Sequence, residues 1–265
     1  MSASFEIWPR TWRLDARGLQ PIALDPAPTT LDAASAQLPA GVYTTFRTYL
    51  GRTRVVGLTA HLDRLDASAA GLGLGQPPDR AALRLALGQT LATMAPPAEA
   101  RVRLTLDLSR APGTLYLTLQ PLQALPAEVY ERGVAVSTSA LHRDAPQIKN
   151  TAFLIDSQPE RAAAGVFELL LLDAAGRVLE GASSNFFGVL DGCLRTAGAG
   201  VLAGVTRGVV LTLAREAGLE TVPEAVPLAQ VPRLSEAFLT SSSRGVVPIV
   251  RVDDHVIGTG APGPV

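Results

Sequence analysis

The pattern of apolar and polar residues along the first 121 positions predicts antiparallel strands with helices between them. Short apolar runs on either side of residues 15–18 predict a hairpin, followed by a Pro- and Ala-rich loop that reaches Pro39. Residues 41–59 are expected to form a second hairpin, and residues 101–122 two strands around a turn at 111–113. This part of the chain is therefore predicted to be an α+β domain.

Two stretches between these strands have the spacing of helices. Leu62, Leu65 and Ala69 lie on one face of a helix expected within residues 61–74. A second helix is expected over residues 79–95, opened by Asp79 and ended before a proline.

The second half of the chain is predicted to be richer in strands. The expected strands lie within residues 133–141, 165–173, 176–180, 185–196 and 236–242. A helix is expected over residues 206–220, with Thr206 as its N-cap and Gly218 just past its end. The predicted organisation is a domain over residues 1–121, a connection over 122–132 and a domain over 133–265.

Composition and charge exclude several classes of partner. The 265 residues are 47% apolar with a formal net charge of -1, so the chain can bury a large core but lacks the basic excess that nucleic acid requires. A membrane partner is not expected for the same reason, and the first residues carry no basic segment followed by an apolar run. We expect a cytoplasmic protein. The single cysteine, Cys193, is expected to be a bystander in a turn.

Lys149 is the only lysine in the chain, and the other basic residues are arginine. A lysine can lose its proton when desolvated and form a Schiff base with a carbonyl, which arginine cannot do. A chemical role for Lys149 is thus one interpretation. An exposed lysine retained by chance in an Arg-rich composition is the other, and the count alone does not separate them. Asparagine is also scarce, and Asn150 and Asn185 both lie beside candidate functional stretches.

Glu180 ends a predicted strand and is followed at once by Gly, small residues and Ser-Ser-Asn. Such a connection brings backbone amides and hydroxyls close to a flat ligand, while the carboxylate points at one edge of it. A carboxylate of this kind would keep a pyridine nitrogen protonated and make the ring an electron sink. A solvated turn is the simpler alternative.

Three further stretches are candidate anion sites. Gly204, Val205 and Thr206 open a predicted helix, whose free amides and dipole attract an anion. A strand also delivers the serines at 241–243 into a turn. Each could equally be an ordinary helix start or loop.

The third candidate is Arg64, three residues after His61 on one face of a predicted helix. A rigid guanidinium there could bind a phosphate. An ion pair of Arg64 with Asp63 or Asp66 is the alternative. None of the three histidines has a partner at metal-ligand spacing, so no metal site is expected.

The order of these motifs resembles that of the class IV pyridoxal-phosphate aminotransferases. In chain order they are HLDRL, the lone lysine, VLEGASSNFFGVL, GVTR and a Ser-rich turn closing in VVPI. This fold-type-IV group holds branched-chain and D-amino-acid aminotransferases and 4-amino-4-deoxychorismate lyases. The likeness runs from about Gly41 to Gly258 and implies the two-domain architecture of the group, with a smaller N-terminal α+β domain and a larger C-terminal mixed-sheet domain. It also implies a homodimer with the active site near the interface.

The resemblance implies a role for each motif. Lys149 would hold pyridoxal 5′-phosphate as an internal aldimine and then transfer the proton, and Glu180 would pair with the ring nitrogen. The phosphate would be held by Arg64, Val205, Thr206 and Ser242, with Ser241 as a weaker candidate. On the substrate side, Tyr43 resembles a pocket residue, and Arg103 resembles an arginine that meets a carboxylate, with Arg101 and Arg47 as possible substitutes. A strand arginine that faces water is the alternative for this position.

The sequence also departs from the family pattern. Many relatives have a tyrosine a few residues after the lysine, whereas this chain has Thr151-Ala152-Phe153-Leu154. Arg244 and Gly245 stand where several aminotransferases have a small residue and a glutamate, and a new charge there could alter substrate choice. The length is nearer to that of the lyases.

The expected activity is transfer of an amino group between an amino acid and a 2-oxo acid. Removal of pyruvate from 4-amino-4-deoxychorismate is the first alternative, and a silent relative that binds the cofactor without turnover is the second.

Overall fold

The computed structural model describes residues 8–74, 78–95 and 98–265, and the chain divides into two compact units. Unit 1 contains the described residues up to Gln123 together with Ile148–Asp156, and unit 2 contains Ala124–Gln147 and Ser157–Val265. The segment that carries Lys149 thus belongs to unit 1, although its neighbours on both sides in the sequence belong to unit 2.

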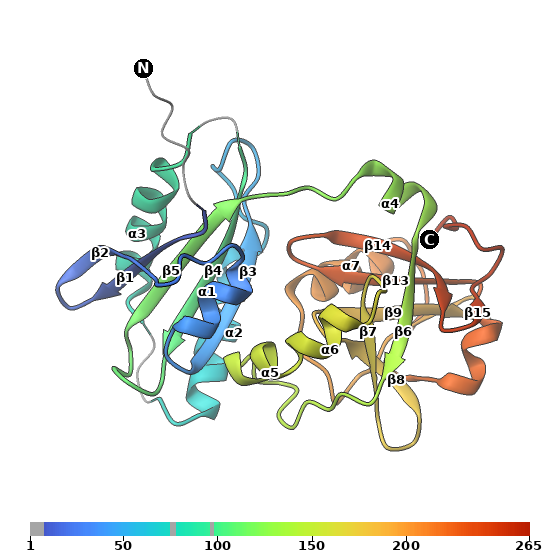
Figure 1. The fold of residues 1–265 in the computed structure, drawn as a ribbon. Coiled ribbons are helices and arrows are strands. Elements are labelled where there is room, and N and C mark those ends of the chain that lie inside the picture. Colours follow the sequence, from blue (N-terminus) through green and yellow to red (C-terminus); the bar gives the residue numbers. More distant parts are fainter. Residues whose placement is uncertain (1–7, 75–77, 96–97) are drawn as a thin grey trace. The chain divides into compact units, whose positions relative to one another are not determined.

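Unit 1 is a five-stranded antiparallel sheet with helices on both faces (Figure 1). Its strands lie in the order β2-β1-β5-β4-β3. The elements are β1 (Arg10–Asp15), β2 (Gly18–Ile22), α1 (Leu31–Gln37), β3 (Gly41–Arg47), α2 (Leu58–Gly71), α3 (Arg80–Ala92), β4 (Ala100–Asp107), β5 (Leu115–Pro121) and α5 (Thr151–Asp156).

The core of unit 1 lies between the sheet and helices α2 and α3. Strand side chains alternate between the two faces of a sheet, and Val42 and Phe46 of β3 point into this core. Leu62 and Leu65 of α2 meet them there. The two predicted helices are confirmed, and Asp79 caps α3 by accepting hydrogen bonds from the amides of residues 81 and 82.

Two predictions for unit 1 were wrong. The stretch up to Pro39 is not all loop, because Thr30 caps the seven-residue helix α1. Residues 41–59 do not form a hairpin: β3 pairs with β4, and beyond it only an isolated bridge joins Tyr49 and Arg54. The first hairpin, β1–β2, is confirmed; the part of its leading apolar run that falls in residues 1–7 lies outside the described residues.

Unit 2 is built on a ten-stranded mixed sheet (Figure 1). Its elements are α4 (Ala127–Arg132), β6 (Val134–Ser139), α6 (Gln158–Ala163), β7 (Leu169–Leu172), β8 (Arg177–Gly181), β9 (Ser184–Leu190), β10 (Cys193–Arg195), α7 (Val205–Glu216), β11 (Thr221–Val222), β12 (Val226–Pro227), the 3-10 helix η1 (Leu228–Arg233), β13 (Glu236–Ser241), β14 (Gly245–Val252) and β15 (His255–Val256).

The sheet of unit 2 closes on itself. The strand order is β11-β10-β9-β13-β14-β6-β7-β8-β12, and β8 also pairs with β9. Strands β9, β13, β14, β6, β7 and β8 therefore form a ring around a core that contains Phe186, Leu239 and Ile249. The predicted strands of this half are confirmed.

The start of α7 differs from the prediction. Thr206 is not its N-cap, because Gly204 caps the helix and Val205 is its first residue. Gly218, with φ +72°, does lie just past the helix end, as predicted. Among the described residues, no helix is both long and apolar enough to cross a bilayer.

Candidate functional site

Lys149 is held by its backbone against the edge strand of unit 1. Its carbonyl accepts a hydrogen bond from Tyr43 N at 2.8 Å, and its amide donates to Ser68 Oγ of α2 at 3.3 Å. An antiparallel bridge joins Val42 and Asn150. These contacts cover the edge of β3 and fix the lysine to strand and helix together.

The Lys149 side chain approaches the ring of Tyr43. Its Nζ atom is 4.8 Å from the ring centroid, within range of a cation–π contact. The guanidinium of Arg103 is 4.9 Å from the same centroid. Tyr43 is buried, so two cations share one buried aromatic ring.

Arg103 is 2% exposed, and its guanidinium is heavily hydrogen-bonded. It donates to Asp32 Oδ1 and Ser35 Oγ of α1 at 2.8 Å each, and to Thr45 Oγ1 of β3 at 3.0 Å. These contacts tie α1 to the sheet and hold the guanidinium beside Tyr43. Recognition of a substrate carboxylate by Arg103 stays a prediction.

Arg64 of α2 contacts β3 through a buried hydroxyl. Its Nη2 donates to Thr44 Oγ1 at 2.9 Å, and Thr44 Oγ1 lies 2.7 Å from His61 Nδ1. The two aspartates considered as its alternative partners, Asp63 and Asp66, both form ion pairs with Arg80. Arg64 is thus joined to a buried threonine and histidine.

His61 is fully buried and uncharged near neutral pH. Burial, together with the smaller effect of the positive charges of Arg64 and Lys149, lowers its pKa to about 3. The Phe46 ring lies 5.3 Å away, centroid to centroid. Among the described residues, His61 Nε2 has no hydrogen-bond partner.

Glu180 of unit 2 lies at the end of β8, where the β8–β9 hairpin turns. It is 2% exposed, and its Oε2 accepts hydrogen bonds from Asn185 Nδ2 at 3.0 Å and Leu202 N at 3.1 Å. Arg143 Nη1 forms a buried ion pair with Oε1 at 3.0 Å. Two hydrogen bonds to Oε2 and the Arg143 cation beside Oε1 stabilise the negative charge of this carboxylate.

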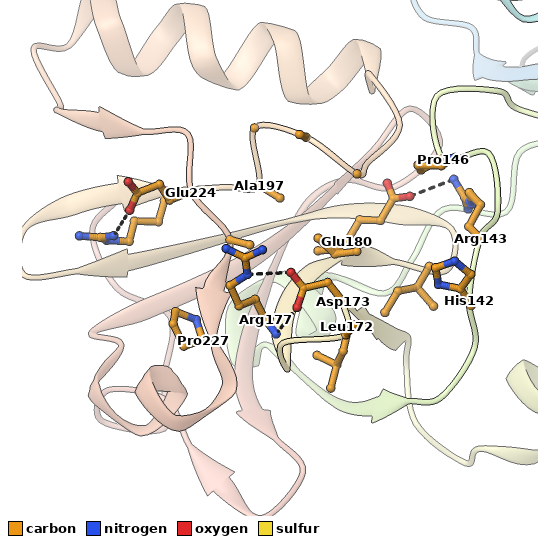
Figure 2. A pocket seen from close by; sticks show the side chains of 18 of the residues that line it. His142, Arg143, Pro146, Leu172, Asp173, Arg177, Glu180, Ala197, Glu224 and Pro227 are labelled. Carbon is orange, nitrogen blue, oxygen red and sulfur yellow. Dashed lines mark hydrogen bonds and ion pairs between the residues drawn. The ribbon is translucent and has the colours of Figure 1, made fainter. Parts of the chain in front are cut away.

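A cavity of about 710 Å³ opens beside Glu180 within unit 2. Figure 2 shows the Glu180 carboxylate and Arg143 at one part of its wall, with the Arg177–Asp173 ion pair and Glu224 at others. Glu224 forms an ion pair with Arg195, which also lines the cavity. Of the predicted site residues only Glu180 lines it, so the predicted phosphate residues of unit 2 lie outside this cavity.

Gly204 allows the start of α7 to pack against Asn185. A Cβ atom at residue 204 would lie 1.9 Å from Asn185 Oδ1, so any larger residue would displace the amide that holds Glu180. No side chain caps the helix. The first amide groups of α7 therefore lie at the positive end of the helix dipole and next to Asn185, which holds Glu180.

Thr206 and Ser242 place two hydroxyls together at this helix start. Their oxygen atoms are 3.5 Å apart, although the residues come from α7 and from the turn after β13. Ser241 Oγ instead accepts a hydrogen bond from Arg244 Nε at 3.1 Å. Arg244 also pairs with the buried Glu168 at 2.9 Å.

The predicted site residues thus form two groups. Unit 1 contains Lys149, Tyr43, Arg103 and Arg64, and unit 2 contains Glu180, Val205, Thr206, Ser241 and Ser242. The sequence analysis missed two residues: Thr44, which contacts Arg64 of the first group, and Arg143, which forms an ion pair with Glu180 of the second. Their residue types carry no local signal, whereas the scarcity of asparagine had already singled out Asn185.

Comparison with known proteins identifies the family. The model of the family described as "Amino-transferase class IV" matches residues 41–252 of this chain. A provisionally named branched-chain-amino-acid aminotransferase of Methanocaldococcus jannaschii is 32% identical over 233 residues, which cover 82% of this chain and 80% of that protein. The branched-chain-amino-acid aminotransferase of Pseudomonas aeruginosa is 35% identical over 147 residues, about half of each chain (52% and 48%).

The fold is shared with a solved structure of this group. A provisionally named branched-chain amino acid aminotransferase of Thermotoga maritima superposes with a TM-score of 0.78, covering 96% of this chain and 91% of that one at 27% identity. The predicted fold class is therefore confirmed. Since the family match covers most of the sequence, the chain belongs to the class IV aminotransferases.

Proposed function

We propose that this protein is a pyridoxal-phosphate-dependent transaminase that exchanges an amino group between an amino acid and a 2-oxo acid. The observation that carries the proposal is Lys149, the sole lysine, with its amine against a buried tyrosine ring in a structure whose other unit buries an anionic Glu180. Another solved branched-chain amino acid aminotransferase of this fold is described with pyridoxamine 5′-phosphate bound, which supports the same cofactor here.

The residues present fit this cofactor in chemical type. The helix start at Gly204 has no side-chain cap, and the hydroxyls of Thr206 and Ser242 converge beside it, as an anion site requires. Val205 would contribute its amide, and Arg64 a guanidinium, to the same phosphate. Bound by these residues, pyridoxal phosphate would supply an electrophilic carbonyl carbon and an electron-accepting ring.

Lys149 would perform the covalent and proton-transfer work. Its Nζ atom would bind the cofactor at rest and, once released, would move the proton at the substrate α-carbon. The contacts of its amide and carbonyl with Ser68 and Tyr43 hold the backbone still while the side chain changes partners.

Glu180 would hold the ring nitrogen in its protonated form. Asn185 and Leu202 donate to one carboxylate oxygen and Arg143 pairs with the other, so the side chain is fixed as an anion before a ligand arrives. An acceptor oriented in advance spends little free energy on reorganisation.

We further propose that the amino donors are branched-chain amino acids and that the enzyme is a homodimer. The names of the relatives support the substrate class. Tyr43 would line the substrate pocket, and Arg103 would support it or meet a substrate carboxylate.

Covalent trapping tests the central claim. After incubation with pyridoxal phosphate, borohydride should reduce the imine and attach one cofactor covalently to the chain. The intact mass should rise by the mass of a single adduct, because the chain has only one lysine. Peptide mapping should assign the label to Lys149. A matched Lys149→Arg variant keeps the charge but cannot react, and should show no increase in mass. A label at the amino terminus, with Lys149 unmodified, would refute the assignment.

An activity panel separates the alternatives. L-leucine, L-valine, L-isoleucine and D-alanine are each paired with 2-oxoglutarate, and formation of glutamate is followed. Pyruvate released from 4-amino-4-deoxychorismate without any amino acceptor would instead establish the lyase activity. A visible band that no amino donor shifts would indicate a silent relative.

A further inference from the structure

The contact between Arg64, Thr44 and His61 is unusual for its place in the fold. Thr44 lies on β3 between Val42 and Phe46, on the strand face that packs into the apolar core of unit 1. Both Thr44 and His61 are 0% exposed. Two polar side chains are therefore buried among aliphatic and aromatic groups, where apolar residues would pack at no desolvation cost.

The hydrogen-bond geometry fixes the direction of the Arg64 contact. Arg64 can only donate, so Thr44 Oγ1 accepts from it at 2.9 Å, and the Thr44 proton can then point to His61 Nδ1, which lies 2.7 Å from the same oxygen. Arg64 Nη2 also lies 3.5 Å from Nδ1, an approach that is attractive only if Nδ1 carries a lone pair. On these two contacts we assign His61 the neutral Nε2–H tautomer.

This tautomer has a cost. The Nε2–H group has no partner among the described residues, and a buried donor without an acceptor costs about 1–3 kcal/mol. A core position under selection for packing alone would not need that cost. What His61 contributes in return is an acceptor that orients the Thr44 hydroxyl, and with it the guanidinium of Arg64.

We propose that Thr44 and His61 are positioning residues that hold the Arg64 guanidinium in the orientation that binds the cofactor phosphate. Both act through Arg64 and neither touches the ligand. The inference rests on the proposed function, because it takes Arg64 as a phosphate ligand.

The lowered pKa of His61 agrees with this arrangement. A protonated ring would carry a hydrogen on Nδ1, and it would repel both the Thr44 proton and the Arg64 charge. With a pKa of about 3 the ring stays neutral, and Nδ1 stays an acceptor throughout the physiological range. The groups whose charge lowers the pKa are Arg64 and Lys149.

Binding of two ligands that differ only in the phosphate tests the proposal. Dissociation constants for pyridoxal phosphate and for pyridoxal are measured by absorbance on the wild-type chain, Thr44→Val, Thr44→Ser and Arg64→Met. Thr44→Val should weaken pyridoxal phosphate about tenfold and pyridoxal less than twofold, since only the phosphate contact is lost. Thr44→Ser keeps the hydroxyl and should remain within about twofold of wild type for both ligands.

A second pair of variants covers the case in which Thr44→Val does not fold. His61→Asn keeps a polar acceptor near the place of Nδ1, and His61→Leu removes it. The preference for pyridoxal phosphate over pyridoxal, measured as the ratio of the two dissociation constants, should fall about fivefold more in the leucine variant than in the asparagine variant. In an Arg64→Met background, Thr44→Val should have no further effect on the ratio of the two dissociation constants.

The outcomes distinguish the two claims. Equal loss for pyridoxal and pyridoxal phosphate in Thr44→Val, or no loss, overturns the positioning role while the proposed function stands. A wild-type chain that binds no pyridoxal phosphate overturns both.

Discussion

The buried network around Glu180 in unit 2 and the one around Arg64 in unit 1 hold opposite charges in different ways. Glu180 accepts hydrogen bonds from Asn185 and Leu202 and forms an ion pair with Arg143. Arg64 is held through a chain of two hydrogen bonds that ends at an imidazole whose other nitrogen has no partner among the described residues. The Glu180 carboxylate is therefore held by groups that compensate its charge. The Arg64 guanidinium is held by hydrogen bonds that set its orientation and carry no opposite charge.

This difference predicts where each unit is vulnerable. Removal of a partner in unit 2 leaves a buried charge less well compensated, which lowers the free energy of unfolding. Removal of a partner in unit 1 leaves the arginine charged and half-buried but less well directed, which should affect ligand binding more than folding. The variants below test this contrast, from the largest expected effect to the smallest.

Arg143→Met should produce the largest loss of stability. It removes the cation beside Glu180 Oε1 while the carboxylate stays buried, and loss of one partner of a buried ion pair costs about 3–5 kcal/mol. Urea unfolding followed by circular dichroism reports on both units. Fluorescence reports on unit 1 only, because both tryptophans, Trp8 and Trp12, lie there. The loss of stability should appear in the unfolding transition of unit 2, which circular dichroism detects and fluorescence does not.

The double variant Glu180→Gln/Arg143→Met provides the control for that experiment. It removes both charges, so part of the lost stability should return. A single-variant loss below about 1 kcal/mol would show that the pair is solvated in solution, and the contrast between the units would fail.

Gly204→Ala should cost about 1–3 kcal/mol and weaken cofactor binding. Its backbone angles, φ -68° and ψ 135°, suit any residue, so the cost comes from the Cβ contact with Asn185 Oδ1 and from the replacement of a glycine N-cap by alanine. Gly208→Ala, in the same helix and with no atom within 4 Å of the added Cβ, is the matched control. That variant should gain about 0.5–1 kcal/mol, because alanine is the better helix former. Similar effects for the two variants would contradict the packing argument.

The pH dependence of stability should reveal His61. Its pKa is about 3 in the folded chain and 6.5 when unfolded, so on acidification the unfolded chain takes up the proton first. The stability that depends on a neutral His61 is complete above pH 6.5 and is lost as the pH falls toward 3. The loss should be about 1 kcal/mol between roughly pH 6.5 and 5.5.

Thermal unfolding of His61→Asn across this range isolates the effect. The difference in stability between wild type and variant should shrink as the pH falls, whereas exposed His255, changed to Asn, should leave the wild-type profile intact. Parallel profiles for wild type and His61→Asn would mean that the ring is not buried neutral.

The sequence revealed the elements and residues with strong local signals and missed those set by distant packing. Helices α2 and α3 follow from apolar spacing and a capping aspartate. Helix α1 has only seven residues, and tertiary burial of Leu31 and Ala34 stabilises it, so its own pattern was too short to read. The false hairpin at 41–59 arose because β3 pairs with β4, about sixty residues later in the chain, which no local window records.

The same division holds for the site. Lys149 and Glu180 could be singled out as candidates because one is unique in the composition and the other heads a recognisable motif. Arg143 and Thr44 could not, because an arginine in an Arg-rich chain and a threonine in a strand become distinctive only when folding brings them to Glu180 and Arg64. The unsatisfied nitrogen of His61 is likewise a property of its surroundings in the described part of the chain.

The smallest expected effect separates two neighbouring serines. Ser242→Ala should weaken pyridoxal phosphate about two- to fivefold, the value of one hydrogen bond of about 0.5–1 kcal/mol, because its hydroxyl lies beside Thr206 at the start of α7. Ser241→Ala should change the affinity less than about twofold, since its oxygen already accepts from Arg244. Pyridoxal should bind both variants as it binds wild type. The reverse order of the two serines would move the phosphate from the α7 start toward Arg244, and the assignment of Thr206 as a phosphate ligand would fall with it.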